Sequence, residues 1–264
     1  MATGTETGTD TAPVHAPCWT ELGSTDPEAS TAFYAALFGW SAHTDPRPEA
    51  GGYTLMQIGD APVAAITPQY APGQPTAWTV SLRVKDADAI AASVEIAGGK
   101  ALMPPMDVFD SGRFAVFTDP GGAVFTVWQP REFGGAQIPG GPNSLGWVEL
   151  STRDPKQAGE FYRHVFNWTA HPSEFYTEWS VGEGPHFGGM ADLGKMGEGS
   201  VGTPPHWKPY FTVQDVDASA AAAVAAGAVI LMPPDDVPDG GPRICVLQDP
   251  QGAPFGIYRA APTD

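Results

Sequence analysis

The chain has 264 residues, of which 42% are hydrophobic and 11% aromatic. That length is more than one hydrophobic core commonly fills, so it predicts two domains of about 130 residues each. The 30 acidic and 13 basic residues give a net charge of −17. A charge of this sign repels phosphate backbones and anionic lipid surfaces, so we expect neither a nucleic acid nor a membrane as partner.

The two cysteines, Cys18 and Cys245, are too few for a disulfide framework. The sequence shows no secretory signal pattern and no apolar run long enough to span a bilayer. We therefore expect a soluble, cytoplasmic protein. Residues 1–13 are rich in Thr and Gly without hydrophobic periodicity, and they are predicted to form a disordered tail.

The first half of the chain opens with an alternating strand, Trp19–Thr25, followed by a helix over residues 26–39. Asp26 is the expected N-cap, Pro27 occupies the first helical position, and Gly39 ends the helix. Three strands are predicted next, at residues 40–43, 52–59 and 62–67. The order then restarts with a strand at 77–84, a helix at 86–99, and strands at 100–105, 113–118 and 123–129.

The second half repeats the first. Trp19, Glu21, Asp26, Phe33 and Tyr34 return 128 positions later as Trp147, Glu149, Asp154, Phe161 and Tyr162. Downstream, LMPP at 102–105 returns at 231–234, and DPGGAVF from Asp119 returns as DPQGAPF from Asp249. Asn167 replaces Gly39, and Asn also tolerates the left-handed conformation that ends a helix. The repeat predicts two homologous domains, residues 14–130 and 144–260, joined by a Gly/Pro-rich linker, residues 131–143.

Each domain contains the order βαβββ twice, so the predicted fold class is α+β with four such modules. One helix over a few strands cannot bury both faces of a sheet, and the modules are therefore expected to pair into curved mixed sheets. The concave face of each sheet is then a natural pocket. The Gly-rich run from Gly182 to Gly202 is predicted to be a long loop that can cover the second pocket.

The WxEL strand, the Asp-Pro helix start, FYAALFGW at 33–40 and the later DPxG turn together resemble the vicinal oxygen chelate superfamily. This superfamily includes glyoxalase I, bleomycin-resistance proteins and extradiol dioxygenases. More narrowly, two copies of WxEL and FY in one chain resemble tandem two-domain actinobacterial proteins that are often labelled hydroxylases or glyoxalase-like. Some of these relatives assist oxidative tailoring in aromatic polyketide pathways. The resemblance implies two glyoxalase-like domains.

The resemblance also implies a divalent metal ion, held by His, Glu or Gln side chains at inward-facing strand positions. The corresponding positions fall on Trp19 and Trp147, on or beside Thr79 and Lys208, and on Thr126 and Gly256. None of these six residues is a normal metal ligand. We therefore expect no metal and no other cofactor, which demotes glyoxalase I and extradiol dioxygenase activity. A metal-dependent lyase or dioxygenase stays open as an alternative.

The Glu two residues after each Trp is the candidate catalytic residue. Strand alternation points Trp19 and Glu21 to the concave face, and likewise Trp147 and Glu149. A carboxylate beside an indole on an apolar face has a raised pKa, which suits a general acid or base near neutral pH. Alternatively, each Glu closes a structural network. Its cationic partner would then be Arg83 in the first domain and Lys208 in the second.

The same alternation places further aromatic side chains on the concave faces, namely Trp128, Tyr210 and Tyr258. With Trp19 and Trp147 they are predicted to stack on a flat conjugated ligand, although they can also be mere core filler. Arg83 and Lys208 complete the candidate substrate-binding set, because a cation can stabilise an oxyanion.

These features predict a metal-independent protein that binds a hydrophobic, aromatic small molecule and tailors a polyketide-type antibiotic or another secondary metabolite. In the catalytic hypothesis, Glu21 or Glu149 abstracts a proton next to a carbonyl, as in an isomerase, cyclase, lyase or cofactor-free oxygenase. The alternative is a non-catalytic protein that sequesters an antibiotic. Two fused domains can complete the pairing that single-domain relatives reach by dimerising, so a monomer or a homodimer is expected.

Overall fold

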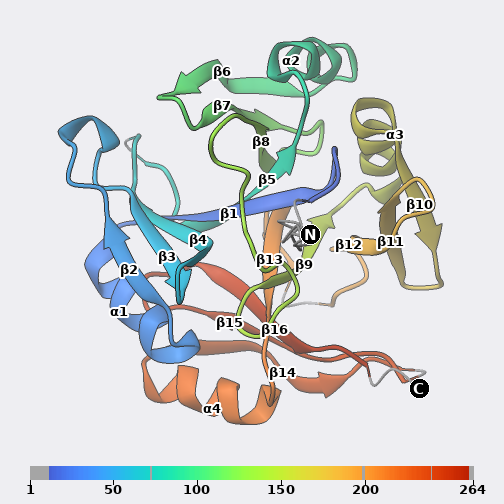
Figure 1. Ribbon diagram of the computed structural model, residues 1–264. Helices are drawn as coiled ribbons and strands as arrows, with labels where there is room; N and C mark the ends of the chain where they lie inside the picture. Colours follow the sequence, from blue (N-terminus) through green and yellow to red (C-terminus); the bar gives the residue numbers. More distant parts are fainter. Residues whose placement is uncertain (1–11, 72, 198–199, 239, 262–264) are drawn as a thin grey trace, which may run out of the picture.

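Two eight-stranded mixed sheets, one from each half of the chain, form the frame of the protein in the computed structural model (Figure 1). The structure describes residues 12–71, 73–197, 200–238 and 240–261. Residues 1–11 of the predicted tail lie outside this range. No helix in the described ranges is long and apolar enough to cross a membrane.

The first half forms eight strands and two α-helices: β1 (Pro17–Ser24), α1 (Pro27–Phe38), β2 (Ser41–Thr44), the short 3₁₀ turn η1 (Pro48–Ala50), β3 (Thr54–Ile58), β4 (Ala61–Pro68), β5 (Ala77–Arg83), α2 (Ala87–Ile96), β6 (Lys100–Val108), β7 (Gly112–Thr118) and β8 (Val124–Pro130). The second half follows the same order: β9 (Leu145–Thr152), α3 (Pro155–Phe166), β10 (Trp168–Pro172), β11 (Tyr176–Val181), β12 (His186–Asp192), β13 (His206–Thr212), α4 (Val216–Ala225), β14 (Val229–Asp236), β15 (Arg243–Gln248) and β16 (Pro254–Arg259). The predicted fold class, four βαβββ modules in two curved sheets, is confirmed.

Each sheet joins its two modules through their first strands. The strand order is β2-β3-β4-β1-β5-β8-β7-β6 in the first sheet and β10-β11-β12-β9-β13-β16-β15-β14 in the second. The central pairs, β1 with β5 and β9 with β13, are antiparallel. Within each module the first and last strands pair in parallel. The middle of each sheet therefore carries the two strands that hold the repeated Trp-x-Glu motif and its cross-strand partners.

The helix boundaries follow from the predicted caps. The Asp26 side chain accepts a hydrogen bond from the Ala29 backbone N–H, and Asp154 does the same for Gln157. Gly39 and Asn167 both adopt the left-handed conformation, with φ of 71° and 56°. An Asx N-cap satisfies an orphan donor and a left-handed residue closes the last turn, so these helices start and stop where the sequence predicts.

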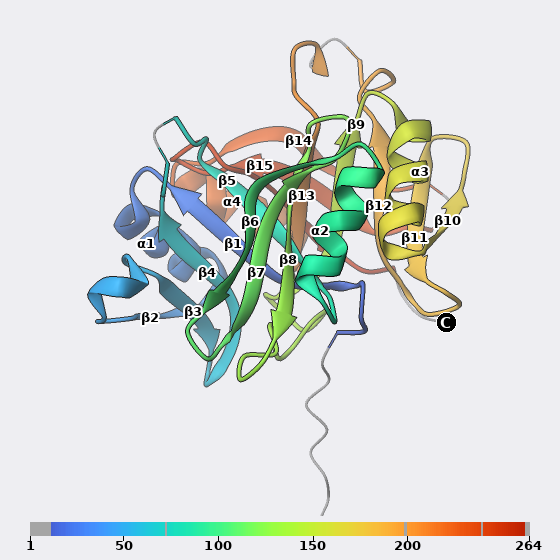
Figure 2. The same cartoon turned by 90° about the horizontal axis from the view of Figure 1, so that it is seen from above.

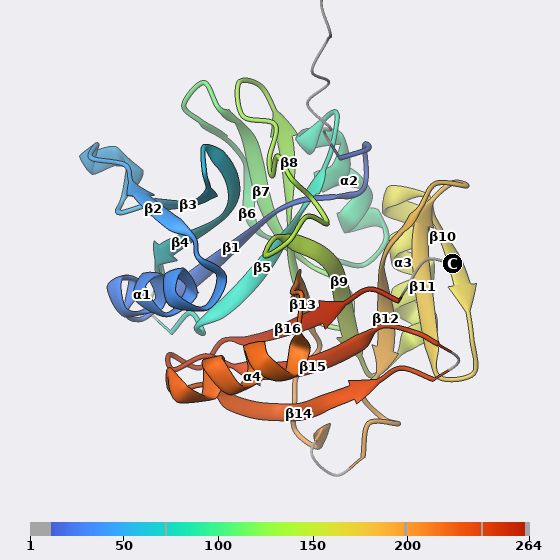
Figure 3. The ribbon, with the colours of Figure 1, turned by 60° about the horizontal axis from the view of Figure 1, so that its bottom comes forward.

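The helices pack against each other across the two halves. Helix α2 lies beside α3 on one side of the molecule, and α1 lies beside α4 on the other (Figures 2 and 3). One hydrophobic core accordingly combines α2 and its strands with α3 and the β9–β12 module, and the other combines α1 and its strands with α4 and the β13–β16 module. Each core thus contains residues from both halves of the chain.

Two hydrogen-bonded triads explain why the FY and DPxG motifs recur. The Tyr34 hydroxyl donates to Asp249 Oδ2 at 2.9 Å and accepts from Trp78 Nε1 at 2.9 Å. In the other core, Tyr162 binds Asp119 and Trp207 in the same way, at 3.2 and 2.8 Å. Burial raises the pKa of both Asp carboxyl groups. The FY tyrosine of one half is therefore held by the DPxG aspartate of the other half.

The predicted loop from Gly182 to Gly202 is partly wrong, because strand β12 runs through it. The glycines of this strand are needed for packing. A Cβ on Gly188 would overlap the Val148 carbonyl, and one on Gly189 would overlap the Tyr176 ring. Glycine inside a strand commonly marks such a close approach. In this run glycine therefore indicates crowding within the sheet as well as turns.

Candidate functional site

The inner face of each sheet, opposite the helices, carries the repeated Glu. Leu22 points toward the α1 core, so by alternation Glu21 points to the inner face of the first sheet. Glu149 does the same in the second sheet, beside Leu150. Across the central strand pair, Glu21 faces Thr79 and Glu149 faces Lys208. The central strand pair therefore places a cation opposite Glu149 and a hydroxyl opposite Glu21.

In the first sheet, Glu21 has hydrogen-bond donors but forms no ion pair with any residue that the structure describes. The Tyr53 hydroxyl donates to Glu21 Oε1 at 2.6 Å, and Trp19 Nε1 lies 3.3 Å from the same oxygen. Trp19 Nε1 also donates to the Tyr53 hydroxyl at 3.1 Å. Burial raises the pKa of Glu21, and the bonds from Tyr53 and Trp19 only partly oppose this. As a residue, Glu21 is nevertheless partly exposed, whereas Glu149 is buried.

Arg83 does not pair with Glu21 in the described residues, contrary to the structural alternative. Its Nη1 donates instead to the Gly134 backbone oxygen, at 3.3 Å. Arg83 nevertheless lies on the same inner face, opposite Trp128. Because no ion pair compensates Glu21 there, its carboxylate is the uncompensated charge of the first site.

In the second sheet, Glu149 sits in a closed network. Lys208 Nζ lies 3.0 Å from its Oε1, and the pair is buried, with 8% and 4% of Glu149 and Lys208 exposed. The Tyr176 hydroxyl donates to Glu149 Oε2 at 3.2 Å, and the Tyr210 hydroxyl lies 3.4 Å from both oxygens. Trp147 Nε1 donates to the Tyr176 hydroxyl at 3.1 Å. The expected Glu149–Lys208 pair is thus formed.

Two glycines make room for this network. A Cβ on Gly189 would overlap the Tyr176 ring, and one on Gly256 would overlap the Tyr210 ring. Gly189 lies in β12 opposite Glu149, and Gly256 lies in β16 opposite Tyr210, so each ring lies over a glycine of the second sheet. This packing leaves the Glu149 carboxylate enclosed by donors.

The remaining predicted aromatic residues are Trp128 in the first sheet and Tyr258 in the second. Trp128 Nε1 donates to the Phe133 backbone oxygen at 2.8 Å, and its ring lies 6.1 Å from the Phe133 ring. Phe133 also packs edge-on against Trp19, at 4.9 Å and 87°. Tyr258 is partly buried beside Thr212 and covers Gly146 rather than Glu149. The structure therefore gathers Trp19 and Trp128 around Phe133.

Sequence reasoning missed three residues of these faces: Tyr53, Tyr176 and Phe133. Tyr53 and Tyr176 play the same part in the two halves, but they lie 123 rather than 128 positions apart, so a fixed-offset comparison does not match them. A search that allowed gaps would have paired them. Phe133 lies in the predicted linker and has no counterpart in the repeat.

The vicinal oxygen chelate superfamily holds a metal ion at certain strand positions. In this chain, the residues at those positions do not fit a metal ion. The pairing register aligns Trp19 with Ser81 and Thr126, and Trp147 with Tyr210 and Gly256. The fifth-strand positions are thus Ser81 and Tyr210, beside the expected Thr79 and Lys208. Ser81 and Thr126 bond each other at 2.5 Å, and the Tyr210 ring covers Gly256. The described residues contain no group of three His, Cys, Asp or Glu that could hold a metal.

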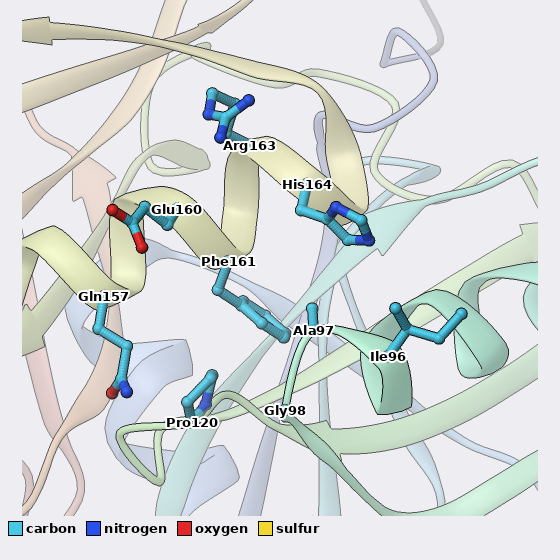
Figure 4. Close-up of a pocket in the computed structure, with 9 residues that line it drawn as sticks. All are labelled: Ile96, Ala97, Gly98, Pro120, Gln157, Glu160, Phe161, Arg163 and His164. Carbon is cyan, nitrogen blue, oxygen red and sulfur yellow. The ribbon is translucent and has the colours of Figure 1, made fainter.

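A cavity of about 650 Å³ lies elsewhere, between the end of α2 and α3 (Figure 4). Phe161 points across it toward Ala97, and Glu160, Arg163 and His164 come from α3. The cavity is on the helix side of the sheets and contains none of the residues of the two Glu networks. We therefore place the candidate site on the inner faces, and foremost around Glu21.

Comparisons with known proteins agree with this architecture. Residues 147–258 match the model of a glyoxalase-like domain, and residues 18–127 match that of the Glyoxalase/Bleomycin resistance protein/Dioxygenase superfamily. The chain is 40% identical over 260 residues to the anthracycline biosynthesis protein DauV of Streptomyces sp. strain C5, covering 92% of each. It is also 40% identical over 262 residues to the anthracycline biosynthesis protein DnrV of Streptomyces peucetius, again covering 92% of each.

Solved structures share the fold at low sequence identity. The Mn(II)-bound glyoxalase of Novosphingobium aromaticivorans superposes with a TM-score of 0.68 at 18% identity, covering 94% of this chain and 83% of that one. At that identity the likeness extends to the fold alone.

Proposed function

Because the chain belongs to the Glyoxalase/Bleomycin resistance protein/Dioxygenase superfamily, we propose that it binds a flat aromatic small molecule on the inner face of its first sheet. Glu21 then acts on this ligand as a general base and acid. Two relatives named as anthracycline biosynthesis proteins support a role in tailoring an aromatic polyketide. The proposed chemistry needs no metal, in keeping with the residues that stand at the superfamily's ligand positions.

The contrast between the two glutamates carries this proposal. Glu149 is enclosed by Lys208 and two tyrosine hydroxyl groups. Glu21 has a raised pKa, no cationic partner in the described structure, and a partly exposed side chain. A general base must come within hydrogen-bond reach of the proton that it takes, and a carboxylate held in a buried ion pair is less available for this than one without a cationic partner. Glu21 is therefore the reactive group and Glu149 the structural one.

The proposed step is proton abstraction from a carbon next to a ligand carbonyl. The C–H bond breaks, the proton moves to Glu21 Oε2, and the electron pair of the bond passes into the carbonyl to form an enolate oxygen. The hydrogen bonds from Tyr53 and Trp19 go to Oε1, which leaves Oε2 for the proton. Returning the proton to a different carbon completes an isomerisation. Arg83, which lies on the same inner face opposite Trp128, is the proposed cation for the enolate oxygen.

The test follows deuterium uptake at C2 of 1-tetralone, a flat aryl ketone, by NMR in D₂O. Wild-type protein should accelerate this exchange, and Glu21→Gln should lower the rate by about 100-fold or more while 1-tetralone affinity stays within about threefold. Glu149→Gln is the matched comparison and should retain exchange at temperatures where it is folded. Unchanged exchange in Glu21→Gln, or loss only in Glu149→Gln, would contradict the assignment.

A second candidate function is ligand sequestration without turnover. It is favoured by the aromatic side chains that gather at Trp19 and Trp128, because stacking on such rings needs no acid or base. Tight binding of aryl ketones by wild-type protein with no exchange above the buffer rate would select this function. Elemental analysis of the purified protein addresses the metal-dependent alternative, since one equivalent of tightly held Fe, Zn, Ni or Mn would overturn the metal-free chemistry.

A further inference from the structure

The segment that follows β8 is fastened to the first sheet and is not a free linker. We call residues 131–137 the strap. Its backbone N–H groups at Phe133, Ala136 and Gln137 donate to the carbonyls of Ser111, Cys18 and Pro62, at 3.1, 2.8 and 3.1 Å. In Figure 3 this yellow-green segment crosses in front of β1.

A glycine allows this close docking. Gly135 has a φ of 103°, and a Cβ at this position would overlap the Cys18 backbone oxygen. Such a conformation and such an approach are open to glycine and not to other residues. The strap is thus shaped to lie against the inner face of β1.

The strap presents one aromatic ring and two carbonyl oxygens to the inner face. The Phe133 ring packs edge-on against Trp19, with the ring centres 4.9 Å apart. The Phe133 oxygen accepts from Trp128 Nε1 at 2.8 Å, and the Gly134 oxygen accepts from Arg83 Nη1 at 3.3 Å. The three predicted ligand-binding side chains of this face therefore all contact the strap. They recognise an aromatic group that carries carbonyl acceptors.

Of the residues that follow β16, the structure describes only 260 and 261, and these form no counterpart of the strap on the second sheet. Trp147, the counterpart of Trp19, is partly exposed, whereas only 3% of Trp19 is exposed. Trp19, which the strap contacts, is therefore covered more completely than its counterpart Trp147. Its position beside the partly exposed Glu21 places it where a ligand of that carboxylate would lie.

We propose that Phe133 and Gly134 are an internal occupant of the ligand site, and that the true ligand is an aryl ketone or quinone that displaces them. The ligand ring replaces the Phe133 ring against Trp19, and its carbonyl oxygens take over Trp128 Nε1 and the Arg83 guanidinium. This inference rests on the proposed binding function and names its ligand class. The strap then acts as a competitor that any ligand must overcome.

The test measures the affinity of 1-tetralone by calorimetric titration and compares it with tetralin, which has the same ring skeleton and no carbonyl. Phe133→Ala should bind 1-tetralone about tenfold more tightly than wild type, because an aromatic contact no longer competes. Phe133→Leu, which keeps apolar volume, should show a smaller gain and guards against a folding defect in the alanine variant. Phe175→Ala, at a side chain that is 72% exposed in the second half, is the control and should change nothing.

Trp128→Phe tests the carbonyl donor separately. This variant keeps an aromatic ring but removes the N–H, so the preference for 1-tetralone over tetralin should fall about tenfold. If Phe133→Ala and Phe133→Leu unfold at the same temperature as wild type but bind 1-tetralone equally or more weakly, the ligand does not displace the strap. The proposal would then be wrong. An unchanged preference in Trp128→Phe would reject the carbonyl ligand class.

Failure of this inference can be told from failure of the proposed function. Tighter binding by Phe133→Ala together with normal exchange in Glu21→Gln would support displacement of the strap by the ligand. It would reject Glu21 as the base. Loss of exchange in Glu21→Gln without any gain in Phe133→Ala would keep the base and reject the strap as a competitor.

Discussion

Glu21 and Glu149 occupy the same place in the repeat, yet the residues directly across the central strand pair differ in charge. Thr79 faces Glu21 and uses its hydroxyl to bond the Glu21 backbone oxygen at 3.2 Å, which leaves the carboxylate without a cation. Lys208 faces Glu149 and is as buried as its partner. A buried pair adds little net stability while intact, but removing one member strands the other charge.

Glu149→Gln should therefore lower the free energy of unfolding by about 3 kcal/mol, because it leaves the Lys208 ammonium buried without a counter-charge. Adding Lys208→Met should recover most of that loss, since the second change removes the stranded charge. Urea unfolding of both variants at neutral pH measures this. If the double variant is as unstable as Glu149→Gln alone, the lost stability comes from the tyrosine contacts and not from the ion pair.

The difference in the free energy of unfolding between wild type and Glu21→Gln should depend on pH. Burial raises the pKa of Glu21, so the folded state favours the protonated form. The stability that this gives is fully present below the ordinary Glu pKa of about 4.3 and is lost as pH rises through the raised value. Wild type should therefore lose stability relative to Glu21→Gln as pH rises above about 4.3. Parallel urea-stability curves for the two proteins would show that the Glu21 pKa is not raised.

For single residues, the sequence predicts the face of the sheet on which a side chain lies, because side chains alternate along a strand. It places Trp19 with Glu21 on one face, and it identifies Lys208 as the partner of Glu149. It does not identify Tyr53 or Tyr176, because their contacts with the carboxylates depend on how far the β3 and β11 hairpins fold back over the sheet. That distance is set by turn geometry and cross-strand register, which the periodicity of a single strand does not encode.

At the scale of elements, the strands are shaped by glycines whose neighbours are large. Gly256 lies in β16 directly beneath the Tyr210 ring. Gly159 lies in the middle of α3, and a Cβ added there would have no neighbouring atom within 4 Å. The same residue type therefore has opposite roles in the two elements, one steric and one without a packing reason.

Gly256→Ala should lower the free energy of unfolding by about 1–3 kcal/mol, because the new methyl group displaces the Tyr210 ring and loosens its contact with Glu149. Gly159→Ala is the matched control and should raise stability by up to about 1 kcal/mol, since alanine is the better helix former. Thermal unfolding followed by circular dichroism compares the two. Equal effects in the same direction would contradict the packing argument for Gly256.

The glycines also explain why some elements are harder to predict than others. Helices α1 and α3 are bounded by local signals, an Asp cap at one end and Gly39 or Asn167 at the other, so their limits follow from the sequence. Strand β12 lies in a Gly-rich run that resembles a loop. Its glycines are needed because Val148 and Tyr176, which lie on other strands, leave no space for a Cβ. A residue pattern cannot show which distant side chain needs the space.

At the scale of the whole molecule, the two sheets belong to separate halves of the sequence but the helix-side cores do not. Phe125 of the first half packs with Tyr162 and Phe166 of the second. In the other core, Tyr34 of the first half packs against Phe255. The Tyr–Asp bonds of both triads cross the halves as well. Neither half can therefore complete its own core.

This shared packing predicts a single cooperative unfolding transition for the two halves in differential scanning calorimetry, with equal calorimetric and van't Hoff enthalpies. Tyr34→Phe removes the donor to the buried Asp249 carboxyl and should cost about 1–2 kcal/mol, or about 2–4 °C of unfolding temperature per kcal/mol. The transition should nevertheless stay single, because the apolar contacts of both cores remain. Tyr70→Phe, at a side chain that is 59% exposed, is the control and should leave the temperature nearly unchanged. Two resolved transitions in wild type, or in Tyr34→Phe, would contradict the shared core. Each half would then fold independently, and the cross-half triads would only hold two folded domains together.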